Sequence, residues 1–93
     1  MYFFFMKIPK EINTKRNQID EIDLKLMDLL VKRMKLSSQI GKIKKSLNIR
    51  FKDIEREKLI LRNLKERYLE HLSEDEIASF FKTIFDLSIK KQK

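Results

Sequence analysis

IDEIDLKLMDLLVKRMKLSSQIGKIKKSL, residues 19–47, is the stretch that decides the fold. Its apolar residues recur in steps of three and four, the spacing of one face of an amphipathic α-helix. The members of this apolar seam are Ile19, Ile22, Leu26, Leu29, Leu36, Ile40, Ile43 and Leu47. Arg33 fills the one step that lacks an apolar residue. Because an unpaired charge at a helix interface is costly, we expect Arg33 to face an anion.

Two further stripes with helical spacing also contain polar residues. The first stripe comprises Ile54, Glu57, Leu61, Leu64 and Tyr68, and the second comprises Ile77, Phe81, Ile84, Ser88 and Gln92. In a stripe that packs against another helix, each polar group needs a partner. Three such stripes therefore predict a polar pocket inside an all-α bundle of three helices per chain.

The composition favours helix and a single domain. The chain has 93 residues, with one Gly, one Pro and no Cys. Few helix breakers argue against strands and tight turns, and the absence of cysteine suits a reducing, cytoplasmic setting. No apolar run reaches the roughly 18 residues of a membrane span, so we expect no membrane association.

The formal net charge of +8, from 22 Lys+Arg and 14 Asp+Glu, suits an anionic partner. For most of the lysines, however, a solvated basic surface is the favoured explanation. His71 has no second nitrogen or sulfur ligand nearby in the pattern, so no metal is expected.

The boundaries follow from capping residues. Asn13 or Thr14 is the expected cap of the first helix, which runs to Ser46 or Leu47. Asp53 caps a second helix over residues 54–70, and Ser73 with Glu76 forms a capping box for a third helix that continues nearly to the end. We assign residues 1–12 to a disordered or extended segment and residues 13–93 to one domain. The long first helix cannot bury its seam within one such chain, so a partner subunit is expected.

Cations on the first helix can share one ligand. Arg33 and Lys44 are eleven residues apart, which is nearly three turns, so both project from one face roughly 16 Å apart. Arg16 is seventeen residues before Arg33, about 25 Å along a straight helix. Arg16 is therefore expected to reach the pocket of another subunit in an antiparallel dimer.

The other helices add an acid and neutral polar groups. Asp53 and Glu57 are one turn apart, and Ser88 and Gln92 interrupt the last stripe. Together with the cations, this set would bind a small dianion that carries a hydroxyl group. The pattern contains no nucleophile–base pair and no metal cluster, so any catalysis would be electrostatic and conformational.

Simpler explanations exist for the individual residues. Asp53 is equally well explained as a helix cap alone, and Arg56 as an exposed partner in surface ion pairs. A serine such as Ser88 can bond back to its own helix, and Gln92 stands next to the last residue, where helices fray. Gly41 either permits close approach of another backbone or is a tolerated weak point.

Five segments resemble the all-α chorismate mutases of the AroQ class. They are Arg16-x-x-Ile-Asp-x-Ile-Asp, Leu29-Leu-Val-Lys-Arg33, Ile40-Gly-Lys-Ile-Lys44, Asp53-Ile-Glu-Arg-Glu57 and Ser88-Ile-Lys-Lys-Gln92. The resemblance covers residues 13–93. It implies an intertwined homodimer of three-helix chains that converts chorismate to prephenate without a cofactor, in phenylalanine and tyrosine biosynthesis.

The resemblance also implies roles for residues that bind the substrate carboxylates. Arg33 and Arg16 of the partner subunit would clamp the two carboxylates, and Ser88 would contact the ring carboxylate. Arg56 would support the pocket wall. Two arginine forks that hold two carboxylates can select the folded, chair-like substrate that rearranges.

The remaining implied roles concern the ether oxygen and the ring hydroxyl. Lys44 and Gln92 would donate hydrogen bonds to the ether oxygen, where negative charge develops as the C–O bond breaks. Glu57, helped by Asp53, would accept a hydrogen bond from the ring hydroxyl.

Two alternatives remain open. An isochorismate pyruvate-lyase on the same scaffold would use a similar clamp, although Glu57 favours the mutase. A non-catalytic basic helical dimer would bind nucleic acid in a salt-dependent way. That second alternative leaves Arg33 and Glu57 in apolar stripes unexplained, so we expect no nucleic-acid partner.

Overall fold

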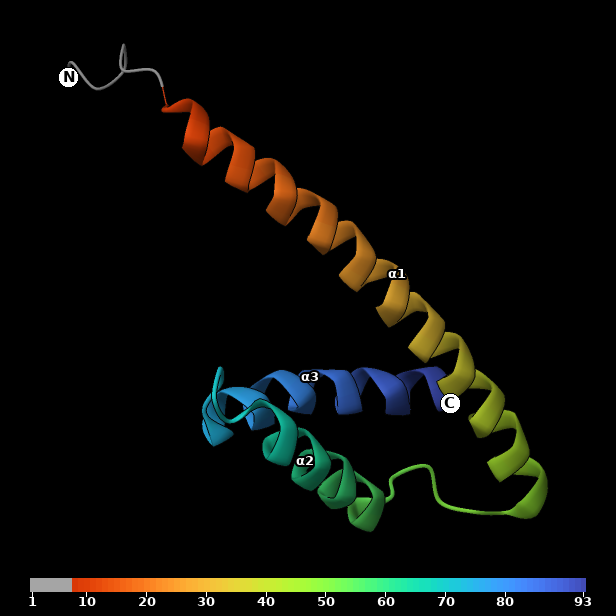
Figure 1. The fold of residues 1–93 in the computed structure, drawn as a ribbon. Helices are drawn as coiled ribbons and strands as arrows, with labels where there is room; N and C mark the ends of the chain where they lie inside the picture. The colour runs from red at the N-terminus through yellow and green to blue at the C-terminus, as the bar shows by residue number, and fades with distance from the viewer. Residues whose placement is uncertain (1–7) are drawn as a thin grey trace, which may run out of the picture. The chain divides into compact units, whose positions relative to one another are not determined.

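The computed structural model describes residues 8–93, which form three helices and no strand. They are α1 (Lys10–Leu47), α2 (Ile54–Tyr68) and α3 (Glu74–Gln92) (Figure 1). The chain divides into two compact units, one that ends at Val31 and one that comprises Lys32–Lys93. The prediction of an all-α chain with three helices and a long first helix is confirmed.

The first helix begins earlier than the sequence predicted. Its first residue is Lys10, directly after Pro9, whose carbonyl oxygen accepts from the amides of Ile12 at 3.0 Å and Asn13 at 3.2 Å. Pro9 therefore opens the helix. Thr14 is not the cap, because its hydroxyl donates to the Lys10 carbonyl one turn back. Residues 10–12 are thus helical, while residues 1–7 of the predicted N-terminal segment lie outside the described residues.

Asn48 ends α1 in the left-handed region, at a φ of 55°. The amide of Ile49 donates to the Lys44 carbonyl at 2.8 Å, and the amide of Asn48 donates to the Lys45 carbonyl at 3.3 Å. This pair of bonds is a Schellman motif, in which asparagine takes the place usually held by glycine. The end at Leu47 agrees with the prediction, and the motif directs the chain into the connector, residues 48–53.

The predicted caps of α2 and α3 are confirmed. Asp53 accepts from the Arg56 amide at 3.0 Å. Ser73 and Glu76 form the reciprocal capping box, with the Glu76 amide donating to the Ser73 hydroxyl and the Ser73 amide donating to the Glu76 carboxylate. α2 ends at Tyr68, two residues before the predicted end. α2 and α3 then lie side by side as a helical hairpin (Figure 1).

The buried face of α1 is one residue out of register with the predicted seam. Within residues 32–93, the buried positions of α1 are Met34, Ser37 and Gly41. Leu36 and Ile40, which belong to the seam, are exposed instead. The physical reason is that small residues admit the close approach of α3. Hydrophobic spacing alone therefore identified the helix but not the face that packs within the chain.

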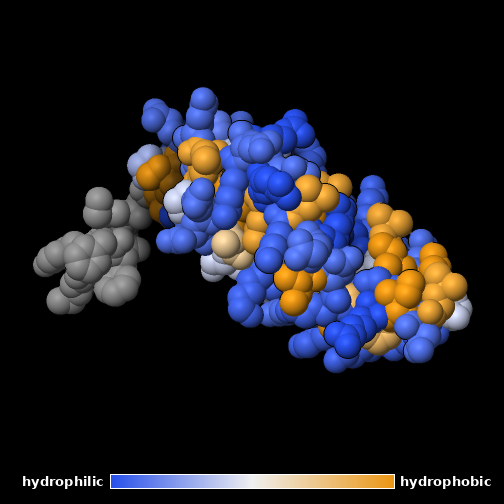
Figure 2. Space-filling model, turned by 90° about the horizontal axis from the view of Figure 1, so that it is seen from below, coloured by the Kyte–Doolittle hydropathy of each residue, from blue (hydrophilic) through white to orange (hydrophobic). Residues whose placement is uncertain are grey.

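The described residues bury few apolar side chains and expose many. The buried ones are Met34, Ile77 and Phe85. Every member of the apolar seam is exposed, from 48% at Ile40 to 62% at Leu47. Figure 2 shows hydrophobic patches that alternate with hydrophilic surface. None of the described helices combines the length and hydropathy needed to cross a membrane.

Candidate active site

A cavity of about 370 Å³ lies within residues 32–93. It is bounded by the last part of α1, the connector, α2 and α3. Of the eight site residues predicted from the sequence, seven line it: Arg33, Lys44, Asp53, Arg56, Glu57, Ser88 and Gln92. A volume of this size is in the usual range for a small-molecule site. Residues from three stripes and a connector thus converge on one space.

Arg33 enters the cavity from α1 and is partly buried. Its Nη1 donates to the hydroxyl of Ser88 on α3, and its guanidinium carbon lies 6.0 Å from the ring centroid of Phe85. Burial lowers the pKa of Arg33, and the positive charge of Arg56 lowers it further. Both effects disfavour the charged guanidinium, and an anion in the cavity would relieve them.

Lys44 is the second α1 cation at the cavity. Its Nζ donates to the carbonyl oxygen of Phe51 at 2.7 Å, and this bond fastens the connector to α1. Phe51 also lines the cavity. The Lys44 ammonium has three donor hydrogens, so it can keep this bond and still donate to a ligand.

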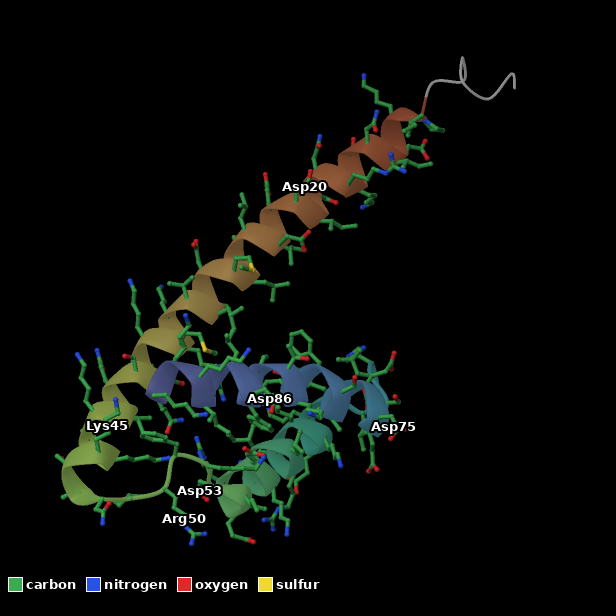
Figure 3. All side chains as sticks on the ribbon, turned by 180° about the vertical axis from the view of Figure 1, so that it is seen from behind. Asp20, Lys45, Arg50, Asp53, Asp75 and Asp86 are labelled. Carbon is green, nitrogen blue, oxygen red and sulfur yellow. The ribbon has the colours of Figure 1, made fainter. Side chains whose placement is uncertain are left out.

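The acidic residues come from the start of α2. Asp53, labelled in Figure 3 near the start of α2, is the N-cap of that helix, and its carboxylate already accepts a hydrogen bond from the Arg56 amide. Asp53 also lines the cavity. The Glu57 side chain is 23% exposed and lies 4.0 Å from the Nζ of Lys52, a long ion pair. The first turn of a helix favours negative charge. Glu57 is therefore available as an acceptor for a ligand hydroxyl.

Gln92 reaches the cavity from the last turn of α3. Its Oε1 is buried and has no hydrogen-bond partner among the described residues. The backbone of Gln92 packs directly on Gly41, where a Cβ would lie 2.8 Å from the Gln92 carbonyl carbon. Gly41 is thus a site of close backbone approach. Gln92, which sequence position alone left open to fraying, is helical and partly buried.

Arg16 is the eighth predicted residue, and it belongs to the unit that ends at Val31. It is exposed on α1 and is not among the residues that line the cavity. Its contribution from a partner subunit stays a prediction.

The sequence did not point to Phe85 and Phe51, which line the cavity, or to Lys45, which lies outside it. Phe85 is buried beneath Arg33, and its spacing of three from Ser88 could have revealed it. Phe51 lies in the connector, where no periodic pattern exists. Lys45 looked like one more surface lysine, yet its Nζ donates to the carbonyl oxygen of Lys93 at 2.6 Å.

The charge balance of the cavity suits an anion that also carries a neutral polar group. Three cations line it, namely Arg33, Lys44 and Arg56, against the carboxylates of Asp53 and Glu57. Among residues 8–93, no three His, Cys, Asp or Glu side chains are grouped so as to hold a metal ion. The groups present can orient a substrate and stabilise developing negative charge.

Comparison with known proteins agrees with this chemistry. The family model for chorismate mutase type II matches residues 15–93. A chorismate mutase from Methanocaldococcus jannaschii is 35% identical over 78 residues, which are 84% of this chain and 76% of that protein. A bifunctional chorismate mutase/prephenate dehydratase from Buchnera aphidicola is 39% identical over 79 residues, 84% of this chain. The match spans only 21% of that longer relative.

Solved structures give the same result. Form II of the chorismate mutase from Thermus thermophilus aligns with a TM-score of 0.85 and 25% identity, covering 89% of this chain and 94% of that one. A conserved hypothetical protein from Pyrococcus furiosus aligns with a TM-score of 0.77 and 31% identity. This alignment covers 92% of this chain and 100% of the other chain. The chain therefore belongs to the chorismate mutase type II family.

Proposed function

We propose that this protein is a chorismate mutase, an isomerase that rearranges chorismate to prephenate. The observation that carries the proposal is the position of Arg33. This guanidinium is partly buried, its pKa is lowered by burial and by Arg56, and it faces the cavity with only a serine hydroxyl as its hydrogen-bond partner among residues 8–93. Arg33 forms no ion pair within residues 8–93, and a substrate carboxylate would supply its anion.

The reaction needs positioning rather than proton transfer. One C–O bond breaks and one C–C bond forms within a single molecule, so no proton, electron or leaving group crosses to the protein. The main task is to hold the enolpyruvyl arm over the ring. Arg33 would grip one carboxylate, with Ser88 beside the ring carboxylate, and the fixed geometry lowers the entropic barrier. Arg56 would support this wall and add positive charge.

Charge stabilisation would come from Lys44 and Gln92. Negative charge builds on the ether oxygen as the C–O bond breaks, so donors aimed at that atom bind the transition state better than the substrate. The Lys44 ammonium and the Gln92 side-chain amide both line the cavity. By analogy with an oxyanion hole, loss of one donor is expected to reduce the rate about 10²–10³-fold.

Glu57 would accept a hydrogen bond from the ring hydroxyl of the substrate, and Asp53 would assist Glu57. The two residues lie one turn apart on α2 and both line the cavity. Asp53 also has its capping bond to the Arg56 amide, so its contribution to binding would be the smaller one. This pair gives the site a reason to prefer a hydroxylated ring.

We further propose that the protein acts in the cytoplasm as a homodimer, with Arg16 of the partner subunit completing each site. The exposed apolar seam supports the dimer, because monomeric proteins rarely leave so many large apolar side chains in water. Arg16 stands on the same helix as that seam. The second arginine of the carboxylate clamp would come from across the interface.

The decisive experiment is to incubate the purified protein with chorismate and follow its ultraviolet absorbance. Acidification then converts any prephenate to phenylpyruvate, which is measured separately. Loss of chorismate with matching phenylpyruvate is the expected result. Release of pyruvate from isochorismate, with no prephenate from chorismate, would assign the lyase reaction instead. Salt-sensitive binding of duplex DNA with no turnover of either compound would contradict both enzymes.

A further inference from the structure

We propose that Lys45 is a positioning residue for Gln92: it holds the last turn of α3 against α1 and so keeps the Gln92 amide in the cavity. The inference rests on the proposed function for its kinetic consequence, and on geometry alone for its structural one. Lys45 does not line the cavity, so it acts through another residue and does not touch the substrate.

The contacts of Lys45 join three parts of the chain. From the last turns of α1 (Figure 3), its Nζ donates to the carbonyl oxygen of Lys93 at 2.6 Å. The same atom lies 5.9 Å from the ring centroid of Phe51, in the connector. Lys93 is the C-cap of α3 and directly follows Gln92. One ammonium group therefore links α1 both to the end of α3 and to a wall of the cavity.

The location of this bond favours its strength. The last carbonyl groups of a helix have no partner within the helix, and the helix dipole places partial negative charge there. Lysines commonly bind these carbonyls from the same helix. Here the lysine comes from α1, so the cap of one helix also becomes a contact between two helices.

Gln92 depends on such support because its side chain has little anchorage of its own. The Oε1 atom is buried without a hydrogen-bond partner among the described residues. Gly41, one turn before Lys45, lets the Gln92 backbone approach α1, but it has no side chain that could hold Gln92 by a hydrogen bond or a charge. The Lys45 bond supplies the attraction beside that close approach. Gly41 and Lys45 thus fix the position of Gln92 together. Gly41 leaves room for the Gln92 backbone, and the charged Lys45 side chain holds the neighbouring carbonyl group by a hydrogen bond.

The kinetic test compares Lys45→Met with Lys42→Met. Lys42 is an exposed α1 residue with no hydrogen bond or ion pair among residues 8–93, so its replacement controls for lost charge. We expect Lys45→Met to lower kcat about five-fold, the equivalent of one exposed charged hydrogen bond. KM should change little, and Lys45→Arg should restore most of the rate. Equal kcat values for the Lys45→Met and Lys42→Met proteins would overturn the proposal.

A double-mutant cycle tests whether Lys45 acts through Gln92. In a Gln92→Ala background, Lys45→Met should cause no further loss of kcat, because the group being positioned is gone. A further five-fold loss in that background would show that Lys45 acts by another route and would overturn the proposal.

Amide hydrogen exchange separates this inference from the assignment of the reaction. Lys45→Met should speed exchange in residues 89–93, where the Lys93 amide bonds to the Ile89 carbonyl at 3.3 Å, while the capped start of α3 is unchanged. Faster exchange in a protein that leaves chorismate intact would support the positioning role and contradict the proposed function. Unchanged exchange at residues 89–93 would overturn the positioning role whatever the activity.

Discussion

Gly41 and Gln92 touch through their backbones: a Cβ on Gly41 would lie 2.5 Å from the Gln92 Cα and would overlap its carbonyl oxygen. The contact lies beside the cavity that the Gln92 side chain lines. The distance between two helices is thus set at the residue that we propose to bind the ether oxygen.

Gly41→Ala should therefore impair catalysis although alanine is the better helix former. Alanine favours an isolated helix by about 1 kcal/mol over glycine, but its methyl group would push the Gln92 backbone away from α1. We expect kcat to fall at least about ten-fold, since a displacement of about 1 Å at a catalytic group is costly. The matched control is Gln39→Ala, at an exposed α1 position. Wild-type kcat in Gly41→Ala would contradict the role of this contact.

Arg33→Met should separate activity from stability. The substitution removes a charge whose pKa is lowered by burial and by Arg56, so the urea midpoint of unfolding should stay equal or rise. The same substitution removes a carboxylate partner, and kcat/KM should fall about 10²-fold or more. The control, Lys35→Met at an exposed site, should change neither the urea midpoint nor kcat/KM. A large loss of stability in Arg33→Met would indicate that Arg33 is a structural residue.

Mixing two inactive variants should restore activity if Arg16 acts across a dimer interface. Hybrid dimers of Arg16→Ala and Arg33→Ala contain one doubly defective site and one intact site. After random exchange of subunits, half the dimers are hybrids, so about a quarter of the wild-type activity should return. Unmixed samples of each variant, denatured and refolded in the same way, are the controls. No recovery on mixing would place both arginines in the site of one chain, and wild-type activity in the unmixed Arg16→Ala sample would show that Arg16 is dispensable.

Leu29→Glu should disrupt the proposed dimer. Leu29 is 61% exposed in the single chain, and a charge there would be buried at an interface between seams. We expect a smaller sedimentation coefficient and a thermal midpoint that no longer rises with protein concentration. Gln18→Glu adds the same charge at an exposed position outside the seam and should remain dimeric. A Leu29→Glu protein that sediments like the wild type would contradict an interface formed by the seam.

The Ser73–Glu76 capping box should make stability depend on pH in the acid range. The amide of Ser73, and to a lesser degree its hydroxyl, lower the pKa of the Glu76 carboxyl. Because the folded-state pKa lies below the unfolded one, this stabilisation is fully present above about pH 4.3 and is lost as the pH falls through the folded-state pKa. At pH 7 the wild-type protein should therefore have a higher melting temperature than the Glu76→Gln protein. The difference between the two melting temperatures should become smaller toward pH 3. A difference in melting temperature that does not change with pH would exclude the charged Glu76 carboxylate as the cause of that difference.

The sequence predicted well those features that depend on a repeated spacing of apolar residues or on a helix-capping residue. Helical spacing indicated the inward face of α3, where Ile77 and Ser88 are buried, and Asp53 and Ser73 were recognised as caps because capping chemistry is local. It did not indicate the face of α1 that packs within the chain, since Ser37 and Gly41 carry no hydrophobic signal. Small size matters only once a neighbouring helix is present.

The sequence pointed to some of the residues that line the cavity and not to others. Arg33 and Glu57 were conspicuous because a charge in an apolar stripe demands an explanation. Phe51 was not, because a connector has no period from which its direction can be inferred. The bond from Lys45 to Lys93 joins residues 48 positions apart, and no local pattern reports a contact of that range.

The arrangement of Ser88 and Gln92 on α3 limits how this chain can change in length. The two residues are four positions apart on one helix that is capped at Ser73, so one residue inserted between them would rotate Gln92 by about 100° out of the cavity. An insertion at residues 69–72, before the cap, would leave that register intact. Among descendants of this sequence, length variation should therefore accumulate in the α2–α3 turn and be purged from the last turns of α3.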